Sequence, residues 1–137
     1  MRPPLADLVR GCFEAYRRQD RAAIERLIAD DFIFVSPYDD NIGRADYFAR
    51  CWPNAEYIRA HRIETIVESG NEAFVVYECE LKTGARFRNA ERFIFEGERI
   101  ARVEVYFGDP PSGVEKAEYL AFLDVAKEAW KGGGAQR

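Results

Sequence analysis

Apolar residues in the first third of the chain recur three and four residues apart, which is the spacing of one helix face. Pro3 and Pro4 stand at the start of this pattern, and proline is well tolerated in a first helical turn. Asp20 is placed to cap a second, shorter helix, because its carboxylate can accept a hydrogen bond from the following turn. We therefore predict helices over about 5–18, 21–29 and 44–52.

Beyond residue 57 the apolar positions alternate with polar ones, which is the pattern of strands. Short glycine-containing segments separate the alternating runs and are typical of hairpin turns. A further short strand is predicted at 32–36, before an irregular break at Pro37. Ser112 and Glu115 form a capping box for a last helix over about 112–131. The alternating runs cover 60–70, 72–84, 85–98 and 99–108.

Helices followed by an antiparallel meander and a closing helix are typical of the α+β class. The 137 residues fit a single domain. Helices packed on one side of a strongly curved sheet cannot seal it completely. We therefore expect a central cavity at the open end of the sheet, where a ligand would bind.

One strand of the meander carries an acid among aromatic side chains. The residues that share its inward face are Phe87, Asn89, Glu91, Phe93 and Phe95. A buried glutamate is costly unless a partner compensates its charge or it stays protonated. Glu91 is therefore the first candidate for a working group.

Three segments of the chain resemble the SnoaL-like branch of the nuclear transport factor 2-like (NTF2-like) superfamily. They are YRRQDRAAIERLIADDFIFVSPYDD, RADYFARCWPN and RFRNAERFIFEGERIARVEVYFGD. The resemblance places the core of the domain over about 5–109. The resemblance implies a cone-shaped fold, in which a curved antiparallel sheet and N-terminal helices enclose a central cavity, with the C-terminal helix as an extra element. It leaves the activity open, because isomerases, polyketide cyclases, dehydratases, epoxide hydrolases and non-catalytic carriers share this fold.

Ketosteroid isomerases of this superfamily allow a comparison residue by residue. Their general-base aspartate, just before a proline at the end of the first strand, corresponds to Ser36, and their oxyanion tyrosine corresponds to Cys12. Their second acid, which is protonated in an apolar site, corresponds to Glu91. Because only one of these positions keeps an acid, the comparison argues against steroid isomerisation by that mechanism.

The candidate catalytic residues are Glu91, His61 and Asp39. A buried Glu91 would have a raised pKa and could donate a proton, or it could instead hold a structural hydrogen bond to Tyr16, Tyr77 or a helix group. His61, the only histidine, either faces the cavity or is a partly exposed strand residue. Asp39 could supply a base at the cavity mouth, although its surroundings are more typical of a turn followed by a helix cap.

The fold also predicts which side chains form the pocket wall and which form the outer face of the sheet. Arginines beside Glu91 alternate onto the outer face, and this face often mediates dimerisation in such sheets, so a homodimer is expected. The expected ligand-binding residues are Cys12, Tyr16, Phe34, Ser36, Tyr38, Phe48, Trp52, Tyr77, Phe93, Val105 and Phe107.

Composition removes several classes of function. The net charge of -4, with no basic cluster longer than Arg17-Arg18, argues against nucleic-acid binding. No apolar run is long enough for a membrane helix, and the N-terminus lacks the apolar core of a signal peptide, so we expect a cytoplasmic protein. The three cysteines are widely spaced and there is one histidine, so neither a disulfide framework, a metal site nor a cofactor is expected.

These observations predict a SnoaL-like protein that binds a small, flat, mainly apolar metabolite with a few hydroxyl or carbonyl groups. It would act as a cofactor-independent isomerase, cyclase or dehydratase. The alternative is a non-catalytic ligand-binding or dimeric accessory domain in which Glu91 is structural. The sequence supports both interpretations.

Overall fold

The computed structural model describes residues 3–108 together with residues 121 and 124, and its helices precede the long strands. Apart from these two residues, the helix predicted over 112–131 lies outside the described part of the chain. Among the described residues, no helix is long and apolar enough to cross a membrane. The helices are α1 (Leu5–Arg17), α2 (Arg21–Leu27), α3 (Arg44–Arg50) and the 3-10 helix η1 (Trp52–Tyr57).

Six strands form one curved sheet in the order β2-β1-β6-β5-β4-β3. The last four are the antiparallel meander that the sequence predicts, whereas β1 runs parallel to β6 and makes the sheet mixed. Gly70 and Gly97 turn two of the predicted hairpins with φ of 61° and 64°, which is backbone that glycine adopts without strain. The strands are β1 (Ile28–Ser36), β2 (Asp39–Gly43), β3 (Ile58–Ser69), β4 (Glu72–Leu81), β5 (Arg86–Glu96) and β6 (Arg99–Phe107).

The segment after Pro37 corrects one prediction. The sequence suggests an irregular stretch there, but Asp39–Gly43 is a short strand that pairs antiparallel with β1. Pro37 and Tyr38 form the two-residue turn of this hairpin, and Ile42 opposite Phe34 is buried. The sequence does not predict this strand, because four of its five residues are polar or glycine and only Ile42 contributes an apolar side chain to the core.

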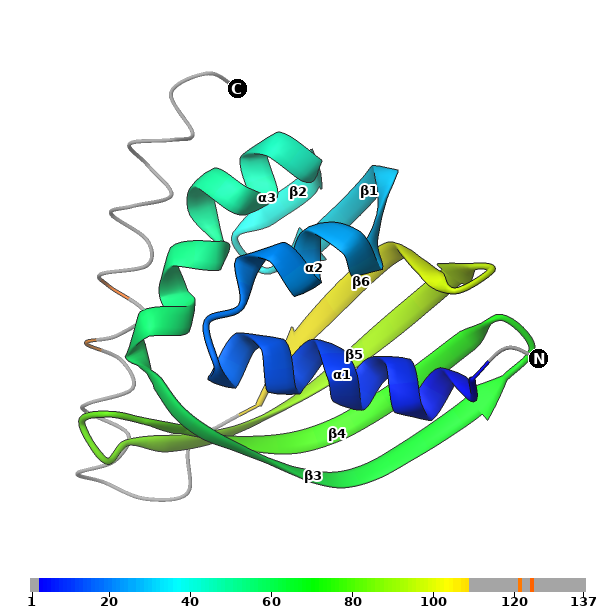
Figure 1. The fold of residues 1–137 in the computed structure, drawn as a ribbon. Helices are drawn as coiled ribbons and strands as arrows, with labels where there is room; N and C mark the ends of the chain where they lie inside the picture. The colour runs from blue at the N-terminus through cyan, green and yellow to red at the C-terminus, as the bar shows by residue number, and fades with distance from the viewer. Residues whose placement is uncertain (1–2, 109–120, 122–123, 125–137) are drawn as a thin grey trace.

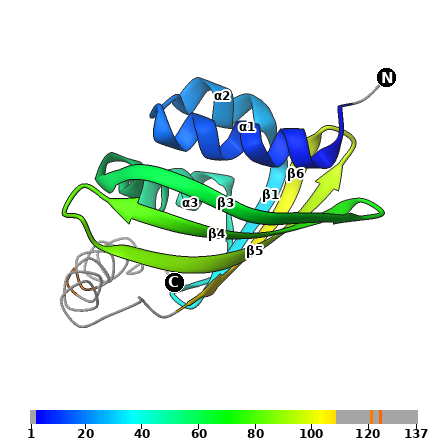
Figure 2. The same cartoon turned by 90° about the horizontal axis from the view of Figure 1, so that it is seen from below.

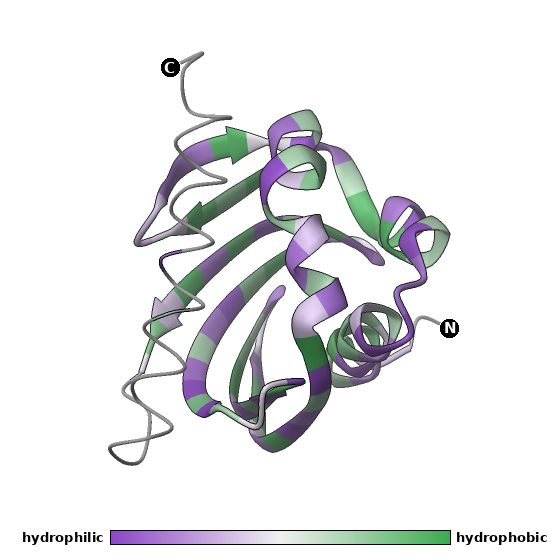
Figure 3. Cartoon of the chain, turned by 90° about the vertical axis from the view of Figure 1, so that its left-hand side faces the viewer, coloured by the Kyte–Doolittle hydropathy of each residue, from purple (hydrophilic) through white to green (hydrophobic). Residues whose placement is uncertain are grey.

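The helices cover the inner side of the curved sheet (Figures 1 and 2). Helix α1 packs against β3 and β4, α2 against β1 and β6, and α3 against β1 and β2. Apolar and polar residues alternate along the strands (Figure 3), so one set of side chains meets the helices and the other faces outward. Asp20 caps α2 as predicted, because its Oδ1 accepts a hydrogen bond of 3.1 Å from the Ala23 N–H.

Candidate functional site

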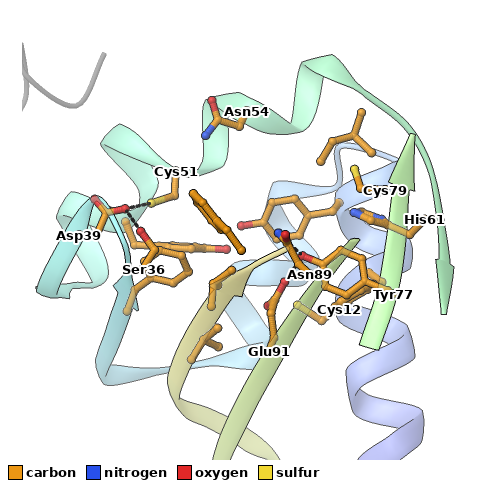
Figure 4. Close-up of a pocket in the computed structure, with 18 of the residues that line it drawn as sticks. Cys12, Ser36, Asp39, Cys51, Asn54, His61, Tyr77, Cys79, Asn89 and Glu91 are labelled. Carbon is orange, nitrogen blue, oxygen red and sulfur yellow. Dashed lines mark hydrogen bonds between the residues drawn. The ribbon is translucent and has the colours of Figure 1, made fainter. Parts of the chain in front are cut away.

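A cavity of about 190 Å³ lies between the C-terminal half of α1, the segment from α3 to η1, and the inner face of the sheet (Figure 4). All six strands contribute side chains to it. Most of the wall is aromatic or aliphatic, and its polar groups gather at two places. We call these the Glu91 end, formed by Glu91, Tyr77, Asn89 and His61, and the Asp39 end, formed by Asp39, Arg50, Ser36, Cys51 and Asn54.

A short chain of hydrogen bonds defines the Glu91 end. The Tyr77 hydroxyl donates to Oε2 of Glu91, and the Asn89 amide donates to the Tyr77 oxygen at 3.3 Å. In the sheet Glu91 stands between Val75 on β4 and Val105 on β6, so its neighbours across the strands are apolar. No ion pair of Glu91 is found in the part of the chain that the structure describes.

The surroundings of Glu91 set its protonation. Removal from water raises the pKa of Glu91 from 4.5 to about 7, against the smaller opposing effect of the Tyr77 hydrogen bond. Near neutral pH both forms of this carboxyl are therefore populated. The cavity thus holds one group that can either donate or accept a proton.

His61 lies on the cavity face, which is the first of the two placements that the sequence leaves open. Its ring lies 4.9 Å from the Phe13 ring and 5.5 Å from the Tyr77 ring. Burial lowers the pKa of His61 to about 4, so the imidazole is neutral at neutral pH. Its Nδ1 is buried without a hydrogen-bond partner among the described residues. The neutral His61 ring can therefore donate or accept a hydrogen bond with a ligand, but it is a weak base.

Asp39 forms the centre of the second polar cluster. Its Oδ1 accepts a hydrogen bond of 3.1 Å from Nη2 of Arg50, and the two side chains are 10% and 4% exposed. Its Oδ2 accepts from the Ser36 hydroxyl at 2.7 Å and from the Cys51 thiol at 3.8 Å. Asp39 is neither a free base nor a turn residue, because a buried cation and two further donors engage its carboxylate.

Most of the predicted ligand-binding residues line the cavity, but two do not. The Phe48 ring lies 4.4 Å from the Arg21 guanidinium, on the side of α3 that faces α2. The preceding residue, Tyr47, takes the inward position instead and packs on the rings of β1. Trp52 packs edge-on against Tyr16 at 4.9 Å and so supports a lining residue without being one. The predicted residues that do line the cavity are Cys12, Tyr16, Phe34, Ser36, Tyr38, Tyr77, Phe93, Val105 and Phe107.

Sequence reasoning missed several lining residues. Strand parity places Phe87 and Asn89 on the inward face with Glu91, but the expected ligand-binding set leaves them out. No local signal marks Arg50, since its partner Asp39 stands 11 residues earlier on a different element. The missed residues are Phe13, Tyr47, Arg50, Cys51, Asn54, Ile58, Phe87 and Asn89.

All three cysteines are free thiols, and all three line this cavity. Burial raises the pKa of Cys79 to about 12 and moves the pKa values of Cys12 and Cys51 upward as well. They are therefore protonated near neutral pH and weak nucleophiles. Among the described residues, no group of three or more histidine, cysteine or acidic side chains is placed to hold a metal ion.

Comparisons with known proteins agree with this architecture. The family model for the SnoaL-like domain matches residues 9–103. An NTF2-like protein from Cytophaga hutchinsonii has a TM-score of 0.64 at 19% identity, over 78% of this chain and 92% of its own. IdmH from Streptomyces antibioticus, named a putative polyketide cyclase, has a TM-score of 0.63 at 16% identity, over 85% and 97%. Another putative polyketide cyclase, from Sinorhizobium meliloti, has a TM-score of 0.60 at 21% identity, over 72% of this chain and 93% of its own. No curated protein matches the sequence.

Proposed function

Because the chain belongs to the SnoaL-like family of NTF2-like proteins, we propose that its cavity binds a small, mainly apolar metabolite and catalyses a proton transfer on it. The proposed reactions are an isomerisation, a cyclisation or a loss of water, none of which needs a cofactor. Two proteins of the same fold are described as putative polyketide cyclases, which supports this group of reactions without distinguishing among the three.

The observation that carries the proposal is the position of Glu91. Its carboxyl stands on the cavity floor with a hydroxyl as its partner and no ion pair among the described residues. A general acid or base works best when its pKa is close to the working pH, and this carboxyl meets that condition. Asp39, the other carboxylate among the described lining residues, is held by Arg50 in an ion pair and is not free to act on a ligand.

The chemistry follows from these two protonation states. In the ionised state, Glu91 takes a proton from a carbon next to a ligand carbonyl, and the electron pair of that C–H bond moves onto the carbonyl oxygen as an enolate. The protonated Glu91 then returns the proton to another atom of the ligand, which completes an isomerisation. Neutral His61 and the Tyr16 hydroxyl are the proposed hydrogen-bond partners of the ligand oxygen.

Deuterium exchange tests this proposal without knowledge of the natural substrate. Small ketones are incubated with the protein in D2O, and incorporation of deuterium next to the carbonyl is followed by NMR. We expect the wild-type protein to accelerate exchange, and Glu91→Gln to slow it by roughly 10²- to 10⁴-fold, because the variant cannot carry the proton. Glu78→Gln is the matched control, since Glu78 pairs with Arg62 on the outer face of the sheet.

The alternative interpretation gives a different result. If the protein is a non-catalytic ligand-binding or accessory domain, ketones bind without accelerated exchange, and Glu91→Gln changes stability alone. Full exchange activity in Glu91→Gln would remove this residue from the mechanism.

We also propose that the protein is a cytoplasmic homodimer that pairs through the outer face of its sheet. Val67 and Phe74 are paired across β3 and β4 on this face, and they are 53% and 43% exposed. Tyr106 on β6 is 58% exposed. A monomeric mass from light scattering at micromolar concentration would contradict the dimer, and Phe74→Glu should convert a dimer to monomers. The three free thiols support a reducing compartment.

A further inference from the structure

The two polar ends of the cavity lie on one row across the sheet. Val35 pairs with Glu104, so the next residues along these parallel strands, Ser36 and Val105, continue side by side. Val105 in turn pairs with Glu91 on β5. Two strand spacings separate the Ser36 and Glu91 backbones, a distance of about 10 Å. Figure 4 shows Ser36 and Asp39 on one side of the cavity and Glu91 and Tyr77 on the other.

The surface between these ends is apolar. Val105 lies on the cavity floor, and the rings of Phe34, Phe93 and Tyr47 add to the walls. Apart from the tyrosine hydroxyls of the lining, the hydrogen-bonding side chains lie at the two ends of the cavity and not in its middle. A ligand that fits this pattern has an apolar body with polar groups at opposite ends.

The Asp39 end is polar but carries no excess positive charge. Arg50 is balanced there by Asp39, to which it is bonded. Asn54, which lies one turn after Cys51 and whose N–H bonds to the Cys51 carbonyl, brings a neutral amide that can both donate and accept. Among the described lining residues, one arginine faces two carboxyl groups. An anionic ligand would thus meet no net positive charge, whereas a hydroxyl or carbonyl would find partners.

The volume limits the size of the apolar body. The cavity measures about 190 Å³, somewhat more than the ~150 Å³ of an apolar cavity that accommodates benzene. One ring with two small substituents matches this space.

We propose that the ligand of this cavity is an uncharged compound with a single ring and an oxygen function at each of two opposite ends. A carbonyl lies at the Glu91 end, and a hydroxyl or second carbonyl lies at the Asp39 end, where it bonds to the Asn54 amide. This inference rests on the proposed function and adds the substrate class to it.

Three probes of one shape test the substrate class: 4-hydroxyacetophenone, acetophenone and 4-acetylbenzoate. Their dissociation constants are measured at pH 7 by calorimetry or by ligand-observed NMR. We expect 4-hydroxyacetophenone to bind roughly three- to tenfold tighter than acetophenone, which is the gain from one additional hydrogen bond. The anionic 4-acetylbenzoate should bind more weakly than either.

The variant Asn54→Ala tests the second contact. It should bring the affinity for 4-hydroxyacetophenone down to that for acetophenone and leave acetophenone binding unchanged. Asn41→Gly is the control, because Asn41 is exposed, does not line the cavity, and has a φ of 50° that glycine tolerates. This variant should keep the preference of the wild-type protein.

Other binding results would contradict the second polar contact, the uncharged class or the single-ring class of the ligand. Equal affinities for 4-hydroxyacetophenone and acetophenone overturn the second polar contact, and tightest binding of 4-acetylbenzoate overturns the uncharged class. If none of the probes binds while larger ketones still show Glu91-dependent exchange, the single-ring class is wrong and the proposed function stands. If neither binding nor exchange is found with any ketone, both are wrong.

Discussion

Asp39 and Glu91 face the same cavity but have opposite electrostatic surroundings. Asp39 is bonded to the guanidinium of Arg50, with a hydroxyl and a thiol as further donors. Glu91 receives one hydrogen bond, from the neutral Tyr77, and its pKa rises to about 7. Burial alone therefore does not decide the role of an acid in this fold. The partner decides whether the carboxyl is engaged by a cation or stays open to a ligand.

The strand register produces this difference at Glu91. Its neighbour Arg92 projects to the outer face, where it binds Glu72 and Glu104. The pKa values of these two outer carboxyls are lowered, mainly by hydrogen bonds from Arg92 and Arg102 respectively. Since side chains alternate along a strand, these outer acids have arginine partners, and Glu91 on the inner face has none among the described residues.

The largest effect is expected from breaking the ion pair of the Asp39 end. Arg50→Met leaves the Asp39 carboxylate buried without its cation, and we expect a loss of about 3–5 kcal/mol in the free energy of unfolding. Urea denaturation monitored by circular dichroism measures this loss. The double variant Arg50→Met/Asp39→Asn removes both charges and should therefore recover most of the lost stability. A loss below about 1 kcal/mol in the single variant is what an exposed pair would give, and would contradict the buried pair.

The pH dependence of stability tests the Glu91 end. The folded carboxyl has a pKa of about 7 and the unfolded one a pKa near 4.5. As pH rises between these values the unfolded chain releases its proton and the folded chain keeps it, so the free energy of unfolding falls, and it stays lowered above pH 7. Because the carboxyl borders an open cavity, we expect about 2–3 kcal/mol for this penalty.

The variant Glu91→Gln isolates this effect from all other titrating groups. The difference in unfolding free energy between Glu91→Gln and the wild-type protein is measured at pH 4.5 and at pH 8. It should shift in favour of the variant by the size of the penalty as pH rises. A difference that does not change with pH would show that Glu91 ionises in the folded protein as it does in the unfolded chain.

The two acids also differ in how far the sequence predicts them. The inward position of Glu91 follows from local alternation along β5, and a raised pKa follows from its apolar neighbours. The role of Asp39 depends on contacts between separate elements. It requires the β1–β2 hairpin, whose second strand has the sequence pattern of a turn. It also requires the burial of Arg50 at the end of α3, which the sequence of that helix does not predict.

The same distinction applies to the fold. The periodicity of apolar residues predicts the helices and the meander, because each pattern is set within one segment. The parallel pairing of β1 with β6 and the choice of Tyr47 over Phe48 as the lining residue depend on how segments dock. Adjacent residues on a helix differ in direction by about 100°, so the rotation about its axis at which α3 docks decides which of these two rings faces the cavity.

The smallest effect is expected from the hydrogen bond that Glu91 does receive. The Tyr77 hydroxyl stabilises the ionised carboxyl and so opposes the effect of burial. Tyr77→Phe removes this donor, and we expect the Glu91 pKa to rise further, by roughly half a unit to one unit, as the loss of one hydrogen bond implies. The chemical shift of the Glu91 carboxyl carbon in ¹³C-labelled protein, followed with pH, gives the titration midpoint.

Tyr16→Phe is the matched control for this measurement, since it removes a hydroxyl from the same cavity and no hydrogen bond joins Tyr16 to Glu91 among the described residues. Its titration midpoint should equal that of the wild-type protein. An unchanged midpoint in Tyr77→Phe would mean that the hydroxyl does not stabilise the ionised carboxyl, so that burial alone sets its protonation. A midpoint that rises in Tyr77→Phe and stays constant in Tyr16→Phe would show that a specific partner, and not only burial, sets the ionisation of Glu91.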